Sequence, residues 1–152
     1  WGSGPVADLN AVLTGLAAPF RTLGFNVYEK WSEQVTTPAV MFHPPTGVYE
    51  QAFGPSGDAR MTLTVEAEVL VSLAGGIQNA QVVMNRYLSN TGANSIRAAI
   101  ALDRTLGGNA NYALCHGWRD YDTKVIGGDL NPTRDSGVEY LGATMAIEVD
   151  VS

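Results

Sequence analysis

Residues 61–73, MTLTVEAEVLVSL, decide the class of fold that this chain adopts. Apolar side chains occupy every second position from Leu63 to Val71, and the positions between them carry mostly Thr, Glu and Ser. Successive side chains of a strand point to opposite faces, so the alternation predicts a half-buried strand of an antiparallel sheet. The stretch is about twice the usual strand length, and we expect it to project beyond the sheet as a hairpin arm.

Five further stretches are expected to be strands, because they alternate in the same way or are rich in β-branched and aromatic residues. They are residues 25–31, 38–42, 47–53, 111–126 and 140–151. We expect a bend at Gly117, since a glycine inside a strand pattern marks a bulge. In the last stretch Glu148 and Asp150 fall on the polar face, opposite Ile147 and Val149.

Helical periodicity occurs in three places. Residues 8–23 carry apolar side chains at steps of three and four, which predicts an amphipathic helix with Asp8 as its N-cap and Gly24 just after its end. Residues 77–90 show the same period after Gly75-Gly76, and Ser95 is expected to cap a shorter helix that ends before Gly107.

The order of these elements separates strands from helices along the chain. That order predicts an α+β fold, a mostly antiparallel sheet with the N-terminal amphipathic helix and one or two central helices packed on one face. We expect one domain over residues 7–152, and we interpret residues 1–6, WGSGPV, as a cloning remnant.

Composition and charge exclude several function classes. The chain has 152 residues, nine basic and fifteen acidic side chains, a net charge of −6 and 45% hydrophobic residues, which is typical of a packed domain. Proteins that neutralise phosphates carry a basic stripe, which this sequence lacks. No apolar run approaches the ~18 residues of a bilayer span. The lone Cys115 fits assembly in a reducing cytoplasm.

Two groups of side chains have residue types that occur in catalytic or metal sites. His116, Asp120 and Asp122 share a strand face if the alternation is unbroken, but they spread too far along the strand for one ion. Glu66 and Glu68 lie about 6.6–6.8 Å apart along their strand, which overlaps the carboxylate spacing of an inverting glycosidase. Both point the same way, so an exposed acidic stripe is the better interpretation.

Nucleophilic catalysis is not favoured either. Cys115 and His116 are adjacent in sequence and therefore point to opposite faces of their strand, so the imidazole cannot activate the thiol. Cys115 fits a small core position better, and His43, next to Pro44-Pro45, fits a loop. We therefore expect no catalytic residue, no metal and no cofactor.

The layout resembles the tail terminator proteins of long-tailed bacteriophages, over essentially all of residues 7–152. The segments that carry the resemblance are LNAVLTGLAAPFRTLG, PAVMFHPP, MTLTVEAEVLVSL, GGIQNAQVVMNRYL, HGWRDYDTKV and GVEYLGATMAIEVDV. The resemblance implies a structural virion protein at the head-proximal end of the tail. Such a protein forms a hexameric ring that caps the tail tube, ends its polymerisation and joins the head connector. Another connector or tail completion protein is the nearest alternative, and a small hydrolase or ligand-binding module is a more distant one.

The resemblance implies two sets of candidate residues, one that lines the bore of the ring and one that contacts its partners. Genomic DNA passes through the bore without specific binding, so an acidic or neutral lining is expected, and the candidate lining residues are Glu66, Glu68, Glu148 and Asp150. The alternative is that these four only keep an outer surface soluble. Long loops over 46–60 and 127–137 are expected to contact the tube protein and the connector. Their candidate contact residues are Tyr49, Phe53, Asp58, Asp129, Arg134 and Asp135.

Overall fold

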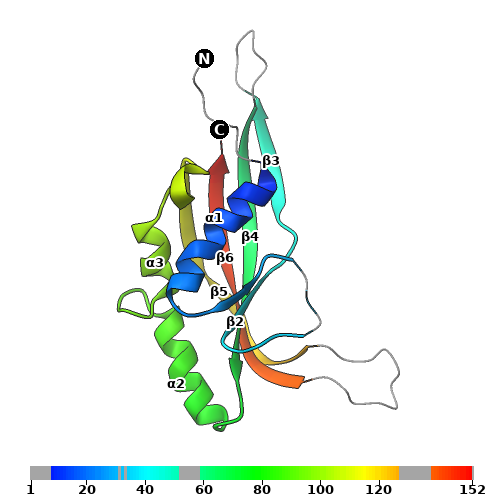
Figure 1. The fold of residues 1–152 in the computed structure, drawn as a ribbon, viewed down its shortest axis with the longest axis vertical. Coiled ribbons are helices and arrows are strands. Elements are labelled where there is room, and N and C mark those ends of the chain that lie inside the picture. Colours follow the sequence, from blue (N-terminus) through cyan, green and yellow to red (C-terminus); the bar gives the residue numbers. More distant parts are fainter. Residues whose placement is uncertain (1–7, 31, 33, 52–58, 127–137, 152) are drawn as a thin grey trace, which may run out of the picture.

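The computed structural model describes residues 8–30, 32, 34–51, 59–126 and 138–151 (Figure 1). Within them the elements are α1 (Leu9–Thr22), β1 (Asn26–Tyr28), β2 (Ala39–Phe42), β3 (Thr46–Gln51), β4 (Ala59–Ser72), α2 (Ile77–Leu88), α3 (Ile96–Leu102), a 3₁₀ turn (Leu106–Gly108), β5 (Tyr112–Ile126) and β6 (Val138–Val151). The α+β prediction is confirmed. The sheet is mostly antiparallel, and only β1 and β2 run parallel.

The helix ends lie where the sequence predicts them. The side chain of Asp8 accepts a hydrogen bond from the Ala11 amide at 2.8 Å, and the side chain of Ser95 accepts one from Ala98 at 3.1 Å. Each bond satisfies a backbone donor that has no partner inside its helix. Gly24 follows α1 with φ of 94°, a conformation that favours glycine, and turns the chain into β1.

β4 is the central strand of the sheet. It pairs with β6 continuously from Met61 to Ser72. Its other edge pairs first with β3 and then with β2, which lie end to end along it. The expectation that residues 61–73 project as an arm is therefore wrong, since that length serves to receive two shorter strands on one side. Figure 1 instead shows the turn end of β5 and β6 curving away from the sheet body.

One face of the sheet carries the main core. The alternate apolar side chains of β4 from Leu63 to Val71, and those of β6 from Leu141 to Val151, pack with the apolar faces of α1, α2 and α3. Phe20 is fully buried and lies edge-on to Phe42, with ring centroids 5.7 Å apart. This arrangement confirms that all three helices contribute to one core, as the alternation of the two long strands predicts.

The opposite face of β4 and β6 carries the polar positions, and we call it the open face. A small apolar cluster of Ala39, Met41, Leu70 and Tyr140 covers one part of it, with Val35 packed against this cluster. The rest is polar, with Glu68, Thr144 and Asp150 nonetheless buried. In the described part of the chain, no helix is long and apolar enough to cross a membrane.

The alternation of side chains between the two faces is interrupted twice along β5. Its register against β6 shifts between Cys115 and Gly117, and again between Arg119 and Asp122. The first shift confirms the bulge expected at Gly117, while the second follows Asp120, whose φ is 55°. As a result Leu114, Arg119 and Lys124 all share the open face although their sequence positions are even, odd and even.

Candidate functional site

The four candidate lining carboxylates lie together on the open face. The register sets Thr64 opposite Glu148 and Thr62 opposite Asp150, so the polar side chains of β4 and β6 share one surface. Side chains of residues directly opposite each other on paired strands point to the same face. The sequence predicted each polar face separately, and the pairing of β4 with β6 brings the two together.

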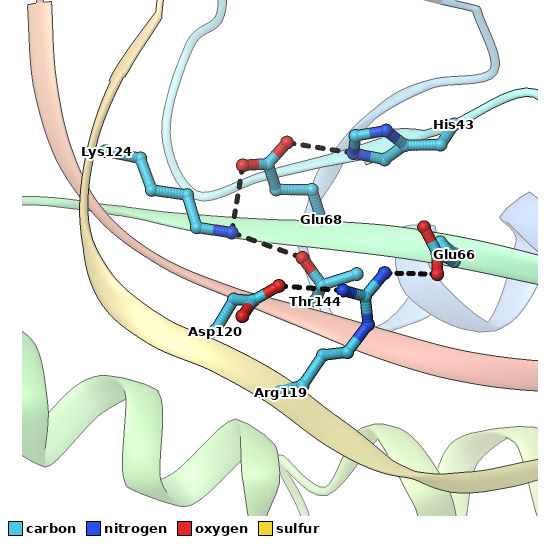
Figure 2. Close-up of polar contacts among 7 residues, drawn as sticks. All are labelled: His43, Glu66, Glu68, Arg119, Asp120, Lys124 and Thr144. Carbon is cyan, nitrogen blue, oxygen red and sulfur yellow. Dashed lines mark hydrogen bonds and ion pairs between the residues drawn. The ribbon is translucent and has the colours of Figure 1, made fainter.

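Glu68 is a buried acid that lies between a lysine and a histidine. It is only 5% exposed, and its carboxylate lies 3.1 Å from the Lys124 Nζ and 3.0 Å from the His43 Nε2 (Figure 2). Lys124 also donates a hydrogen bond to the Thr144 hydroxyl at 3.1 Å. The expectation of an exposed acidic stripe at Glu66 and Glu68 is therefore wrong for Glu68. A buried carboxylate requires such partners, because isolated burial of a charge is very costly.

Backbone geometry makes room for this cluster. The Lys124 stem lies directly over Gly142, where an added Cβ would come within 2.8 Å of the Lys124 Cδ. His43 follows β2 in the connection to β3, and its backbone amide donates to the Glu66 carbonyl at 2.9 Å. The loop position expected for His43 is confirmed. Its imidazole ring also lies beside the buried Glu68 carboxylate.

Glu66 is half-buried and forms an ion pair with Arg119, which also donates to the Asp120 carboxylate at 2.9 Å (Figure 2). Arg119 reaches this face only because of the bulge at Gly117. An unbroken strand would turn its guanidinium toward the helices instead. The bulge therefore supplies the cation that neutralises Glu66.

Asp150 is fully buried at the other end of the open face. Its carboxylate accepts hydrogen bonds from the Arg60 Nε at 2.8 and 3.0 Å, a further one from the Arg60 Nη2, and one from the Asn111 side chain at 3.4 Å. The bonds from Arg60 hold the pKa of the Asp150 carboxyl below its ordinary value, and they outweigh the opposing effect of burial.

Glu148 completes the set. Its carboxylate accepts a hydrogen bond from the Tyr112 hydroxyl at 3.3 Å and lies 3.7 Å from the His116 Nε2. Burial, and then the negative charges of Glu148 and Asp150, raise the pKa of Tyr112. Each of the four carboxylates thus has at least one donor beside it. Three of the four are paired with a lysine or an arginine, which differs from the unpaired acidic surface that the sequence suggested.

The metal-like and nucleophilic groupings do not assemble. The two bulges place His116, Asp120 and Asp122 out of phase, and the described residues contain no cluster of three metal-ligating side chains. Cys115 packs against the main core, and burial raises the pKa of its thiol. A raised pKa is the opposite of what a nucleophilic cysteine needs, which agrees with its interpretation as a small core residue.

The loop candidates fall mostly outside the described residues. Tyr49 lies on β3 and is 75% exposed, next to Val48, which is 64% exposed. The others, Phe53, Asp58, Asp129, Arg134 and Asp135, lie outside the described part of the chain.

Sequence reasoning missed the basic partners of Glu66, Glu68 and Asp150, namely His43, Arg60, Arg119 and Lys124. One signal pointed to them. All four acids of β4 and the end of β6 alternate with apolar positions, where burial is to be expected and a buried carboxylate needs a partner. No protein-family model matches the chain, and a comparison with curated proteins finds no match.

Proposed function

We propose that this chain is a structural protein of a long-tailed bacteriophage that forms a ring on the head-proximal end of the tail tube. There it ends polymerisation of the tube and offers its other surface to the head connector. The proposal starts from the resemblance of the sequence to tail terminator proteins. The order α1, β2, the β3–β4 hairpin, α2 and the β5–β6 hairpin agrees with the layout on which that resemblance rests.

The observation that carries the proposal is the set of strands at the edges of the sheet. On one side lies β5, 15 residues long, and on the other lie β1 and β3. Each of the three pairs with a single strand among the described residues, and β3 exposes Val48 and Tyr49. Exposed strand edges invite pairing with other chains unless something covers them. A head-to-tail ring covers both sides of every subunit, because each interface uses two different surfaces and closes on itself.

We further propose that the open face lines the bore of this ring. Three of its acids, Asp150, Glu66 and Glu68, are paired with Arg60, Arg119 and Lys124, and Glu148 beside the Tyr112 hydroxyl leaves the face acidic on balance. Such a surface gives phosphates few counterions to release and little attraction, which allows DNA to slide past. The alternative, that the face lies on the outside of the ring, predicts no effect of its charges on DNA passage.

Electron microscopy of purified tails, with an antibody against this chain, tests the proposal. We expect one labelled disc at the head-proximal end of each tube. In a phage that lacks the protein, we expect tubes of abnormal length and heads without tails. Label along the whole tube, or at the baseplate, would refute the assignment.

A further inference from the structure

A cleft lies between α3 and the first part of β5, at the outer edge of the sheet (Figure 1). We call it the α3–β5 cleft. Its volume is about 270 Å³, and its lining includes residues 113–115 of β5 together with Arg97, Ala101 and Arg104. Pockets for small molecules usually measure about 300–1,000 Å³. A cavity below that range suits one or two side chains of a larger partner.

The strand wall of this cleft is the main chain of β5. The register sets Leu114 opposite Glu148, so the Leu114 side chain points to the open face, away from α3. Because three consecutive residues, 113–115, line the cleft, Leu114 takes part through its backbone. In the described part of the chain β5 pairs only with β6. Its other edge therefore offers backbone donors and acceptors to an added strand.

The helix wall carries two cations. Arg97, Ala101 and Arg104 follow one another at steps of four and three, which places them on one side of α3 and of the turn after it. Arg97 and Arg104 are exposed, and neither forms an ion pair within the described residues. Arg97 makes one long hydrogen bond, 3.5 Å, to the Asn90 carbonyl. Both guanidinium groups are thus open to an acidic partner.

The surroundings of the two arginines hold little negative charge. Residues 69–102, which include all of α2 and α3, contain no acidic residue, although the whole chain has fifteen. The next acid, Asp103, turns its carboxylate to the Gly107 amide and accepts a hydrogen bond from it at 3.1 Å. The floor of the cleft is apolar, with Ile100 and Ala113 both buried. The cleft therefore combines an apolar floor with two cations, and it is complementary to a segment that is both acidic and apolar.

We propose that the α3–β5 cleft binds an extended acidic segment of a partner protein, which adds to the free edge of β5 as a further strand. Alternate side chains of an extended segment point the same way, so positions i, i+2 and i+4 of the segment face α3. An apolar side chain at i+2 covers the floor over Ile100 and Ala113. Carboxylates at i and i+4 bind Arg97 and Arg104, since a guanidinium matches a carboxylate through two parallel hydrogen bonds.

The spacing of the two arginines fits this arrangement. They are seven positions apart, about 10 Å at the helical rise, and carboxylates at i and i+4 of a strand are about 13 Å apart. The long arginine side chains make up the difference. The cleft uses only the first residues of the 15-residue β5, so the later part of the strand stays open to a neighbouring subunit. The inference goes beyond the proposed function and does not depend on it.

Fluorescence anisotropy with a labelled peptide tests the proposal on the whole chain. The probe is acetyl-Ser-Glu-Thr-Leu-Thr-Glu-Ser-amide, in which the leucine and both glutamates share one face when the peptide is extended. We expect saturable binding that weakens about tenfold or more when both glutamates are changed to glutamine. A peptide of the same composition, acetyl-Ser-Glu-Leu-Thr-Thr-Glu-Ser-amide, turns the leucine to the other face and should bind about fivefold or more weakly.

Reversal of the two cleft charges gives the complementary test. Arg97→Glu/Arg104→Glu should bind the probe about tenfold or more weakly, and it should instead bind the peptide whose glutamates are changed to lysine. An unfolded variant would not show that gain. The control Lys30→Glu/Arg86→Glu reverses two exposed cations outside the cleft and should keep binding within about twofold. Hydrogen exchange of residues 112–116 should slow with the probe bound, because edge amides are then hydrogen-bonded.

Four results would overturn the proposal. They are no saturable binding of the probe up to about 1 mM, equal binding of its glutamine version, unchanged binding by the cleft variant, and displacement of the probe by single-stranded oligothymidylate, which would indicate a phosphate site. Self-association that the cleft variant abolishes would also overturn it, because the occupant would then be a second copy. The proposed function is tested separately by the labelled discs on tails, so each proposal survives the failure of the other.

Discussion

The buried Asp150 allows the most direct test of the charge pairing on the open face. In Asp150→Asn the amide keeps the shape of the side chain but loses the charge that attracts the Arg60 guanidinium. Three hydrogen bonds join these two side chains. A hydrogen bond to a charged group contributes roughly 1.5–3 kcal/mol to stability. Arg60 is about half exposed and regains water when the pair is broken, which reduces the net cost. We expect unfolding free energy to fall by about 2 kcal/mol near neutral pH.

The pH dependence of that loss identifies its cause. The folded-state pKa of Asp150 lies below its ordinary value of 3.8, so the folded state favours the ionised carboxylate. The stabilisation is therefore fully present above the unfolded-state pKa and is lost as the pH falls below about 4 and passes through the folded-state pKa. Urea unfolding of both proteins should show curves that converge toward about pH 3 or lower.

An exposed acid supplies the control. Asp122 is exposed and has no ion pair among the described residues, so Asp122→Asn should change stability by less than about 0.5 kcal/mol at any of these pH values. If Asp150→Asn costs less than about 0.5 kcal/mol near neutral pH, or costs the same near pH 7 and near pH 3, the argument from a buried ion pair is wrong.

Three further outcomes are expected. Lys124→Ala should lower the unfolding free energy by about 3 kcal/mol in urea titrations, because Glu68 then stays buried without its lysine partner. A loss below about 1 kcal/mol would contradict this. If the open face lines the bore, Glu66→Lys/Glu148→Lys should slow DNA ejection at low salt with tail length unchanged, because the new cations attract phosphates. An ejection rate that does not depend on salt would exclude the lining role. Cys115 should react with maleimide slowly until the pH exceeds 9.0, because burial raises its thiol pKa, and fast labelling near neutral pH would contradict this.

Local structure was accessible from the sequence because it depends on residues close together in the chain. The period of apolar positions in residues 9–22 and 61–72 is enough to distinguish a helix from a strand. The capping side chains of Asp8 and Ser95 act within three residues, so their roles were also predictable. The α+β class follows from the order of these elements.

Beyond the first bulge of β5, alternation could not predict to which face of the sheet each side chain points. Alternation assigns a face only while the count of residues is unbroken, and the glycine at 117 signalled one interruption. Nothing local signalled the second shift, between Arg119 and Asp122. The first shift brings Arg119 to the open face, the second keeps Lys124 on it, and together they break the alternation that would have put His116, Asp120 and Asp122 on one face.

Sequence patterns alone predict the elements, their order and the polar face of most of each long strand. The burial of Glu68 and Asp150, and the cation beside each of them, depend on how the strands pair and pack. The physical reason is distance along the chain. Arg60 and Asp150 are 90 residues apart, and their meeting depends on the register of β4 against β6. That register is set by the packing of the whole core, because a slip of one residue would turn every apolar side chain of a strand to the wrong face.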